Sequence, residues 1–582
     1  MVVNSAYTID IPQCSFVDLV FGPPQAELSS SEPLLLDYAR PQSHFLTRHT
    51  FRVWSQRLGG GMTAAGLQKG DRVMVVSGNR LFYSVAFMGV IMAGGIFTGC
   101  NPAYSPHELA HQMRDCDPKF ILSQGGSTLQ TCLEAARMVG RGHKKRTFVF
   151  DDRVFDSVEQ PDEQGCPYWS KLMLFDTEVE RFAWDSLTGP DEARKTTLAL
   201  NYSSGTTGLS KGVEITHGNY VANVVQYNHL MAHNRDYDAK HRQNERYLCF
   251  LPLYHAMAQM LFLGVAQIRH APVYIMEKFD FLGVLQSVEI YRISDLLIVP
   301  PVAVMLAKRP ETKNFDLSSV RYIGSGAAPL SRELSQEVED LWPKGTINIK
   351  QGWGMTELTC ALLGWEHTKT SYSNSVGWPL PNSQAKIMSL PDEAADSDNL
   401  LLRKELGPNE PGELWVRGPQ VMKGYWKNPK ATADTMTPDG WVRTGDIAYY
   451  DNEQKFFISG RLKELIKVKG LQVPPTELDG ACLECKEVAD AAVVGVTIND
   501  QEHPRAYIVL REGTCATNET AQSIAVQVNA KLSHHKRITG GIVFTDSIPK
   551  NPSGKILRRL LRERAQNEVH MEQMHNKTKA FL

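Results

Sequence analysis

Short apolar runs alternate with helix-length segments through the first part of the chain, and this alternation restricts its possible folds more than any other feature. From residue 72 the runs RVMVVS, GGIFTG, KFILS and TFVF are separated by segments long enough for helices. β-rich runs that alternate with helical segments favour a doubly wound, largely parallel sheet. Such sheets bind ligands beyond the carboxyl ends of their strands, where the connecting loops lie.

A second series of the same kind predicts a second α/β subdomain. Its strand candidates are RYLCFL (246–251), PVYIM (272–276), SDLLIVP (294–300), VRYIG (320–324) and INIKQ (347–351). From about Gly377 short strands and turns predominate, which indicates a small β subdomain. The predicted fold class is therefore α/β. A large N-terminal domain, 1–460, combines the two doubly wound subdomains with the β subdomain, and a mobile α+β domain, 461–582, follows it.

Between the two series stands YSSGTTGLSKGV (202–213), whose composition suits a polyphosphate. Its glycines let the backbone approach a ligand, and Lys211 adds a mobile positive charge. The run before it predicts a buried strand, and residues 216–231 predict a helix with Thr216 as its cap. A Walker A loop needs Ser or Thr directly after the lysine, where this chain has glycine. A P-loop NTPase is therefore disfavoured, and so is a merely flexible Ser/Gly turn.

The composition favours a small-molecule partner over a nucleic acid. The 582 residues include 62 basic and 64 acidic ones, and no basic block is interleaved with aromatic residues. Ten cysteines are scattered along the chain, and the C-x-x-C pair Cys482 and Cys485 lacks the second pair that a tetrahedral zinc site needs. We expect the thiols to be reduced and mostly in the core.

Targeting patterns predict a cytoplasmic protein. Residues 1–60 show no secretory signal and predict little beyond a docking arm. The longest uncharged run, 81–106, is interrupted by glycines and polar residues, so a transmembrane segment is not expected. The sequence ends in KAFL and not in Ser-Lys-Leu, which leaves a peroxisomal location as the unsupported alternative.

Seven motifs, taken together and in this order, resemble those of the adenylate-forming (ANL) superfamily, and within it the acyl-CoA synthetases of the 4-coumarate:CoA ligase and firefly luciferase type. The resemblance covers the chain from about residue 45 to 560. The motifs are YSSGTTGLSKGV (202–213), LPLYHAMA (251–258), GSGAAPL (324–330), QGWGMTE (351–357), WVRTGDIAYYD (441–451), GRLKELIKVKGLQVPPTELD (460–479) and PKNPSGKILRR (549–559).

The resemblance implies two half-reactions that use ATP, Mg²⁺ and coenzyme A. A carboxylate first attacks the α-phosphorus of ATP, which gives acyl-AMP and pyrophosphate, and the thiol of coenzyme A then displaces AMP. Activation must come first because a carboxylate is a poor electrophile. The small C-terminal domain is expected to rotate between two positions. The nearest alternative passes the acyl group to a carrier-protein thiol. A luciferase-like oxygenase is a further alternative, and a nucleotide-binding regulator without catalysis is disfavoured because Lys555, Glu357 and Asp446 are all present.

The resemblance also implies an ATP site assembled from several motifs. Thr206, Thr207 and Lys211 fit the pyrophosphate end, Thr356 matches a phosphate-contacting threonine, and Glu357 matches the Mg²⁺ ligand. A helix cap with an acidic first turn is the alternative for the last two. The predicted ATP- or AMP-binding residues are Ser203, Ser204, Gly205, Thr206, Thr207, Gly208, Lys211, Gly326, Ala327, Ala328, Trp353, Asp446 and Arg461.

Within this set, Gly326 to Ala328 suit an adenine slot, and Trp353 offers a stacking face. Asp446 can accept hydrogen bonds from both ribose hydroxyls, and Arg461 can bind the ribose or phosphate side. The predicted catalytic residues are Lys555, Lys467, His255 and Thr356.

Lys555 matches the lysine that the family brings over the active site for adenylation, where its ammonium can bridge the carboxylate and the α-phosphate. Lys463 lies at the hinge position, Lys467 and Gln472 match positions brought near the adenylate, and Gly470 is expected to line the coenzyme A channel.

His255 stands at the boundary between acyl pocket and coenzyme A channel, where it orients the carboxylate or gates the thiol. A packed structural histidine is the equal alternative. The predicted acyl pocket is apolar and contains Met257, Met260, Val302, Cys360 and Leu362, which favours an aromatic or medium-chain carboxylic acid. Coumarate ligases typically have Ala-Gly-Pro-Val after the GMTE motif, whereas residues 358–361 read LTCA, so hydroxycinnamates are not carried over.

Overall fold

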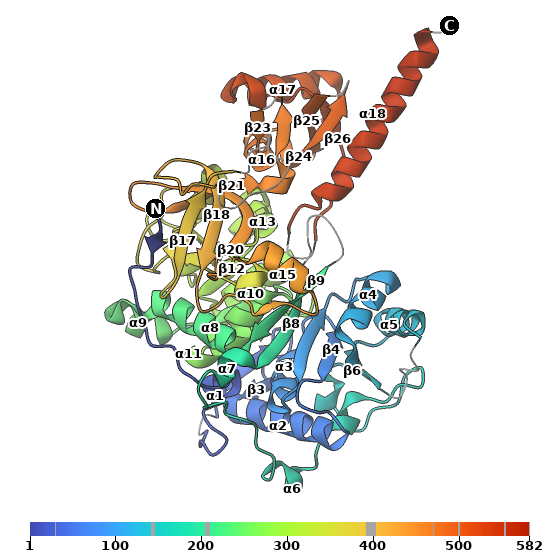
Figure 1. Ribbon diagram of the computed structural model, residues 1–582, viewed down its shortest axis with the longest axis vertical. Coiled ribbons are helices and arrows are strands. Elements are labelled where there is room, and N and C mark those ends of the chain that lie inside the picture. The colour runs from blue at the N-terminus through green and yellow to red at the C-terminus, as the bar shows by residue number, and fades with distance from the viewer. Residues whose placement is uncertain are drawn as a thin grey trace.

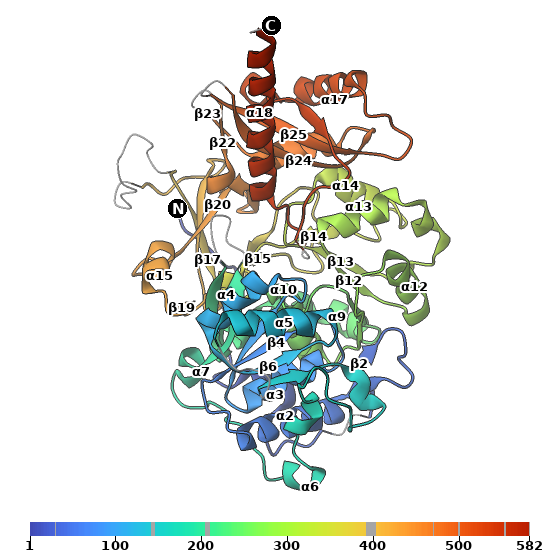
Figure 2. The same ribbon diagram turned by 90° about the vertical axis from the view of Figure 1, so that its right-hand side faces the viewer.

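The computed structural model describes residues 1–28, 31–140, 146–203, 210–390, 403–468, 471–498, 501–551 and 554–580. Within these ranges the strands up to Arg461 build two large α/β sheets and a smaller antiparallel sheet. The C-terminal residues form a small α+β unit at one end of the molecule (Figures 1 and 2). The predicted α/β class and its arrangement into a large and a small part are confirmed.

The first α/β sheet has the strand order β19-β9-β8-β5-β4-β6-β7. Its parallel strands are β4 (Arg72–Val76), β5 (Ile96–Cys100), β6 (Pro118–Ser123), β7 (Thr147–Val149) and β8 (Thr197–Ser203). The helices after β4, β5 and β6 are α3 (Tyr83–Met92), α4 (Pro106–Cys116) and α5 (Ser127–Met138). A capping box starts α4, because Ser105 and Glu108 each accept a hydrogen bond from the other's backbone N–H. The alternation of apolar runs predicted this order of elements.

The second α/β sheet has the strand order β14-β13-β12-β10-β11-β2-β3. The predicted strands appear as β10 (Tyr247–Cys249), β11 (Val273–Ile275), β12 (Asp295–Ile298), β13 (Tyr322–Ser325) and β14 (Ile349–Gln351), all parallel. The longer helices of this part are α8 (His217–Ala232), α12 (Phe281–Tyr291), α13 (Pro300–Lys308) and α14 (Arg332–Glu339). Thr216 caps α8 by accepting from the Asn219 N–H, as the sequence predicted.

The glycine loop does not lead directly from a strand into a helix, and in this respect the sequence-based expectation was wrong. Strand β9 (Lys211–Thr216) first returns antiparallel to β8, with Ser203 opposite Lys211. The described residues on either side of the loop therefore belong to two paired strands. Strand β9 was missed because its first two residues, a lysine and a glycine, belong to the loop motif and not to a typical strand.

The N-terminal segment is more than a docking arm. Strands β2 (Pro33–Asp37) and β3 (Phe45–Thr47) complete the second α/β sheet, where β2 pairs in parallel with β11. Strand β1 (Val3–Asn4) pairs with β17 of the antiparallel sheet, beside which the N-terminus lies in Figure 1. The segment's helices are α1 (Phe16–Phe21) and α2 (Arg48–Ala64). These pairings join segments hundreds of residues apart, which the local pattern could not reveal.

The small antiparallel sheet has the order β1-β17-β18-β20-β21. Its long strands are β17 (Gln384–Met388), β18 (Gly412–Arg417), β20 (Val442–Tyr450) and β21 (Phe456–Arg461). Asp446 on β20 stands directly opposite Arg461, the last residue of β21. Strand pairing thus brings two predicted nucleotide-binding side chains together.

The C-terminal unit is built around the long hairpin of β24 (Val488–Ile498) and β25 (Gln501–Leu510). Neighbouring residues of these strands pack on opposite faces, as the pleat requires. Val493 and Ile508 pack with Ile524, whereas Val494 and Tyr507 pack with Leu561. The other elements of the unit are β22 (Ile466–Val468), β23 (Leu471–Val473), α16 (Pro475–Leu483), α17 (Asn518–Lys531), β26 (Ile542–Phe544) and α18 (Arg558–Ala580).

The shorter elements connect these layers. They are α6 (Asp176–Val179), α7 (Glu192–Lys195), α9 (Arg235–Arg242), α10 (Ala256–Ala258), α11 (Ala266–Arg269), α15 (Pro429–Thr435), β15 (Leu363–Gly364), β16 (Trp378–Pro379) and β19 (Gly424–Tyr425). All ten cysteines lie in described ranges, and none of them forms a disulfide bond. None of the described helices combines the length and the apolar character needed to cross a bilayer.

Candidate functional site

The base of the glycine loop is fixed to the first α/β sheet. Tyr202, near the end of β8, donates from its hydroxyl to Asp115 Oδ2 at 2.5 Å, and the ring of His111 contacts the Ser210 carbonyl oxygen at 2.9 Å. Both partners belong to α4. The predicted residues Ser204, Gly205, Thr206, Thr207 and Gly208 lie outside the described residues. Ser203 and Lys211, at the two ends of the loop, face each other across the hairpin.

Glu357, the predicted metal ligand, is held beside the loop by a residue that the motifs did not reveal. The buried Glu357 follows Thr356 in a single 3-10 turn and accepts a 2.8 Å hydrogen bond from the Tyr425 hydroxyl through Oε1. Lys211 Nζ lies 4.7 Å from the centre of the Tyr425 ring. Burial and the neighbouring carboxylate raise the pKa of Tyr425 far above its usual value, so Tyr425 remains a neutral donor. This leaves Oε2 of Glu357 as an oxygen ligand of the kind that Mg²⁺ prefers.

Asp446 lies at the junction of the two parts of the chain. Its side chain is buried, with 4% of the residue exposed, and accepts a 2.8 Å hydrogen bond from Trp353 Nε1 through Oδ2. Arg461 Nε lies 2.9 Å from Oδ1. Burial raises the pKa of Asp446, while Arg461, Trp353 and Lys555 oppose that shift. The Asp446 carboxylate is therefore held by Trp353 through one oxygen and by Arg461 through the other.

Lys555 reaches the same site from the C-terminal unit. Its ammonium is largely buried, which lowers its pKa, and it interacts electrostatically with Arg461, Asp446 and Glu357. The preceding Gly554 has φ of +80°, and a Cβ there would lie 2.9 Å from Pro301 at the start of α13. This close approach of the two parts of the chain needs glycine.

A buried cluster of charges connects Lys555 to the predicted hinge. Arg558 donates to Asp479 and to the Val493 carbonyl oxygen, and its Nε lies 3.2 Å from Glu464. Glu464 directly follows Lys463, the predicted hinge residue. The Lys463 carbonyl oxygen also accepts a 3.3 Å hydrogen bond from Arg562 of α18. The loop that carries Lys555 is thus tied to the turn that begins the C-terminal unit.

The predicted adenine slot follows strand β13. Gly326 and Ala327 line a cavity, whereas Ala328 stands beside them outside its lining. Ala327 has φ of +70°, a left-handed backbone conformation that is uncommon for a residue with a side chain. Such conformations are concentrated at functional sites.

The cavity has a volume of about 190 Å³ and extends from these residues between the second α/β sheet and α8. Its side toward the nucleotide residues is formed by Trp353, Met355 and Thr356. Its apolar wall includes Met257, Met260, Leu261, Leu297, Cys360 and Trp365, and its polar groups include Tyr227, His255, Tyr322, Lys350 and Gln351. Met260 and Leu261 belong to a π-helical segment, Gln259–Val265. Such segments are frequent at functional sites.

Two of the five residues predicted for the acyl pocket point elsewhere. Val302 packs into the main core cluster, and Leu362 packs with Trp353 and Leu358 in the core of the antiparallel sheet. Neither belongs to the cavity lining, which contains Met257, Met260 and Cys360. The motif positions therefore do not show which side chains of these segments face the cavity.

His255 contributes a polar atom to the cavity wall. Its Nε2 is buried without a hydrogen-bond partner in the described part of the chain. Burial lowers the pKa of His255 to about 4, so the ring is neutral at physiological pH. A neutral imidazole at this place can donate or accept one hydrogen bond. The role of the ring in positioning a carboxylate or a thiol stays a prediction.

The residues predicted for the second half-reaction form a separate group. Lys467 and Gln472 pair across the β22–β23 hairpin, and the Lys467 N–H donates to Glu502 at 2.7 Å. Gly470 lies outside the described residues. In this arrangement Lys555 of the C-terminal unit interacts electrostatically with Asp446 and Arg461.

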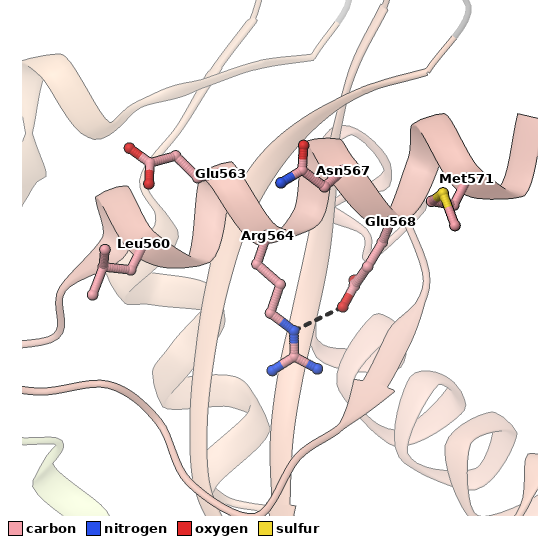
Figure 3. A pocket seen from close by; sticks show the side chains of 6 residues that line it. All are labelled: Leu560, Glu563, Arg564, Asn567, Glu568 and Met571. Carbon is pink, nitrogen blue, oxygen red and sulfur yellow. Dashed lines mark hydrogen bonds and ion pairs between the residues drawn. The ribbon is translucent and has the colours of Figure 1, made fainter.

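Two other features lie away from this site. A hollow along α18 is lined by one helix face alone, where Arg564 forms a 2.7 Å ion pair with Glu568 (Figure 3). Behind Tyr322, the buried His241, Asp295 and His367 lie close enough for a metal ion, but His241 is already 3.0 Å from the Asp295 carboxylate. Neither feature contains a residue predicted for ATP.

Comparison with known proteins agrees with this geometry. The family model described as AMP-binding enzyme matches residues 30–426, and the model described as AMP-binding enzyme C-terminal domain matches residues 477–555. A phenylacetyl-CoA ligase of Aspergillus niger is 33% identical over 570 residues, covering 97% of this chain and 99% of the relative. The 4-coumarate:CoA ligase 1 of Petunia hybrida is 34% identical over 547 residues, covering 92% and 91%.

Solved structures share the fold at lower identity. The anthranilate CoA ligase AuaEII, in complex with anthranoyl-AMP, has a TM-score of 0.79 at 19% identity, covering 96% of this chain and 99% of that one. ATP-bound MatB from Rhodopseudomonas palustris has a TM-score of 0.76 at 23% identity, covering 95% and 99%.

The hydrogen bond from Tyr425 to Glu357 yields a prediction about metal dependence. In Tyr425→Phe the carboxylate loses the donor that orients it, so we expect the Mg²⁺ concentration for half-maximal pyrophosphate release to rise about tenfold. The matched control is Tyr450→Phe, whose hydroxyl donates to the Leu406 carbonyl oxygen in the antiparallel sheet. An Mg²⁺ titration of Tyr425→Phe that superimposes on that of the wild type would contradict the positioning role.

Proposed function

The chain belongs to the AMP-binding enzyme family, and we propose that, as an AMP-forming acyl-CoA synthetase, it activates an aromatic or medium-chain carboxylic acid as acyl-AMP and transfers it to coenzyme A. One observation carries the proposal. Trp353 and Thr356 line one end of a cavity whose other walls are largely apolar, and behind them Trp353 donates to Asp446 while Lys555 of the small part interacts electrostatically with Asp446 and Glu357. A nucleotide bound by these residues would lie next to an acid bound in the cavity.

Adenylation needs positive charge where negative charge develops on the α-phosphate. Lys555 is suited to this because its ammonium is buried near Asp446 and Glu357, in surroundings of low dielectric constant. Its proposed role is to lie between the acid's carboxylate and the α-phosphate as the new P–O bond forms and pyrophosphate leaves. Asp446 is proposed to hold the ribose hydroxyls, with Trp353 and Arg461 fixing its orientation.

The residues present fit a magnesium ion bound together with ATP. Glu357 supplies one carboxylate oxygen, held in place by Tyr425, and Thr356 adds a hydroxyl beside it. Mg²⁺ usually takes few protein carboxylates and completes its coordination with phosphates and water. When bound, the ion would neutralise charge on the phosphates and favour departure of pyrophosphate.

The transfer step is proposed to use the other group of residues. Lys467, Gln472 and Gly470 would approach the adenylate after the small part rotates about Lys463. Rotation lets one cavity serve two reactions without holding both sets of groups at once. Coenzyme A as acceptor is supported by the names of the relatives, a phenylacetyl-CoA ligase and a 4-coumarate:CoA ligase. Both names also specify aromatic acids, which suits the apolar wall of Met257, Met260 and Trp365.

The experiment that tests this function is pyrophosphate release over a panel of aromatic, short, medium and long-chain acids. We expect release with ATP, Mg²⁺ and an aromatic or medium-chain acid, and rapid AMP formation only when coenzyme A is added. AMP formation that needs a carrier-protein thiol instead would overturn the acceptor. If no acid of the panel gives pyrophosphate, the ligase function itself is wrong.

Removal of the Lys555 ammonium should selectively slow the first half-reaction. We expect Lys555→Ala to lower ATP–pyrophosphate exchange a hundred- to a thousandfold, about 3–4 kcal/mol of transition-state stabilisation. The matched control is Lys536→Ala, on the surface of the same unit, where the lysine pairs with Glu477. Unchanged exchange in Lys555→Ala would remove the assignment.

Stiffening the predicted hinge should slow the second half-reaction and spare the first. Proline at position 463 restricts φ, so we expect Lys463→Pro to retain adenylation while thioester formation from purified acyl-AMP falls at least tenfold. The two steps are measured separately, as pyrophosphate exchange and as single-turnover thioester formation. Equal loss of both would argue against rotation about this residue.

A further inference from the structure

The cavity contains a charged group that the proposed chemistry leaves without a task. Lys350 lies in the interior of β14, with 7% of the residue exposed, and its side chain lines the cavity. Burying an ammonium costs free energy unless it is paired or hydrogen-bonded. Within the described residues its one hydrogen bond runs to the Asn348 carbonyl oxygen and is long, at 3.4 Å. An ammonium has three donors, so the protein satisfies this one incompletely.

The carboxylate whose charge acts on Lys350 is already occupied by other groups. Glu339 of α14 accepts hydrogen bonds from Arg332 at 2.9 and 2.6 Å and from the Ile349 N–H at 2.8 Å. Arg332 has two donors in place on this carboxylate, so Glu339 acts on Lys350 from a distance, through its charge. None of the ion pairs formed by the described residues includes Lys350.

Lys350 lies at the end of the cavity remote from the nucleotide residues. In the parallel pair β13–β14, Lys350 stands opposite Gly324, and Ser325 opposite Gln351. The adenine slot begins at Gly326, two residues further along β13, or about 7 Å at the rise of an extended strand. An acid whose carboxylate meets Lys555 at the carboxyl ends of the strands therefore points its far end back toward Lys350.

Two hydroxyl groups accompany the ammonium at this end. Tyr227 and Tyr322 line the same cavity, and their hydroxyl oxygens are 3.3 Å apart. Lys350 Nζ lies 5.7 Å from the centre of the Tyr322 ring. Three donor groups thus surround the far end, while methionines and Trp365 cover the sides. The cavity's 190 Å³ compares with an engineered protein cavity of about 150 Å³ that holds benzene, which limits the acid to about one ring.

We propose that Lys350 determines the acid specificity of this chain by binding an anionic or hydrogen-bond-accepting oxygen at the far end of a single-ring aromatic acid. The inference rests on the proposed ligase function and names the substrate class within it. A second carboxylate and a phenolic oxygen share the required chemistry. Both place an accepting oxygen where the ammonium and the two phenol hydroxyls converge.

The ionisation of Lys350 gives this role a pH signature. Burial lowers the pKa of Lys350 to about 8, with Glu339 opposing the shift. Burial raises the pKa of Tyr227 to about 12 and that of Tyr322 well above 10, and it holds the pKa of His367, stacked on Tyr322, well below 6.5. The His255 pKa is likewise lowered, to about 4. Lys350 is thus the group of this end that changes charge near pH 8, and it is protonated below that pH.

The test compares acids that differ only at the far end. Wild-type kcat/KM for pyrophosphate release is measured with terephthalate against 4-isopropylbenzoate, and with 4-hydroxybenzoate against 4-methylbenzoate, together with the corresponding 3-substituted acids. We expect at least one oxygen-bearing acid to exceed its apolar match tenfold or more at pH 7. The terephthalate pair reports a carboxylate partner, and the hydroxybenzoate pair reports a phenolic one.

Substitution then assigns the preference to the ammonium. In Lys350→Met the ratio of oxygen-bearing to apolar acid should fall ten- to a hundredfold, and Lys350→Arg, which keeps the charge, should preserve a preference above one. Terephthalate is ionised throughout pH 6–9. The wild-type ratio of kcat/KM for terephthalate to that for 4-isopropylbenzoate should therefore fall above about pH 8, where Lys350 loses its charge, and Lys350→Met should not show this fall. Lys344→Met, an exposed lysine ahead of the same strand, is the matched control.

The possible outcomes lead to different conclusions. If Lys350→Met lowers kcat/KM equally for both members of each pair, Lys350 is a structural lysine and the proposal is overturned. A wild type that prefers the apolar acids overturns it as well. Retained ATP binding shows that the variant is folded. Wild-type activity on apolar or aliphatic acids alone leaves the ligase function standing and refutes this inference. No pyrophosphate with any acid refutes the ligase function.

Discussion

The arrangement of the site depends on one buried carboxylate, that of Asp446. A carboxylate in a protein interior is stable only when donors and positive charge compensate for its lost hydration. Trp353 supplies a donor from the loop after β14, and Arg461 supplies a guanidinium from the end of β21. Lys555 of the C-terminal unit adds a second positive charge nearby. Three segments that are distant in sequence therefore interact with the same anion, and the cavity lined by Trp353 opens beside them.

The buried cluster around Arg558 explains how a lysine on a separate unit can be presented with a defined position. Arg558 stands three residues after Lys555 and contacts Asp479 of α16 and Glu464 beside the hinge. Removing one partner of a buried ion pair typically costs about 3–5 kcal/mol, because the other charge stays buried. The Lys555 loop and the predicted hinge turn are thus linked by buried ion pairs. A rotation at Lys463 would carry the lysine away as a whole and would not require the loop to unfold.

Sequence reasoning predicted the elements whose signal is local. The parallel strands β4 to β7 and β10 to β14 were found because each is an apolar run between helix-length segments. Strand β9 and the N-terminal strands β2 and β3 were missed because their partners lie elsewhere in the sequence or because their residues resemble a loop. The same limit applies to side chains. Asp446 and Lys555 could be named from motifs, whereas Tyr425 is 68 residues from Glu357 and no motif joins them.

The two kinds of residue at this site also explain why the reaction class was easier to infer than the acid. The groups proposed to handle the nucleotide include Thr356 in a 3-10 turn and Lys555 in a loop, where the backbone conformation itself is part of the motif. The acid is proposed to extend in the other direction, along β13 and β14, and to meet strand side chains whose identity the strand itself specifies only weakly. A lysine opposite Gly324 leaves the fold intact and changes the chemistry of the far wall. Substrate choice therefore follows from which side chains face the cavity, and this can be seen only once the strands are aligned.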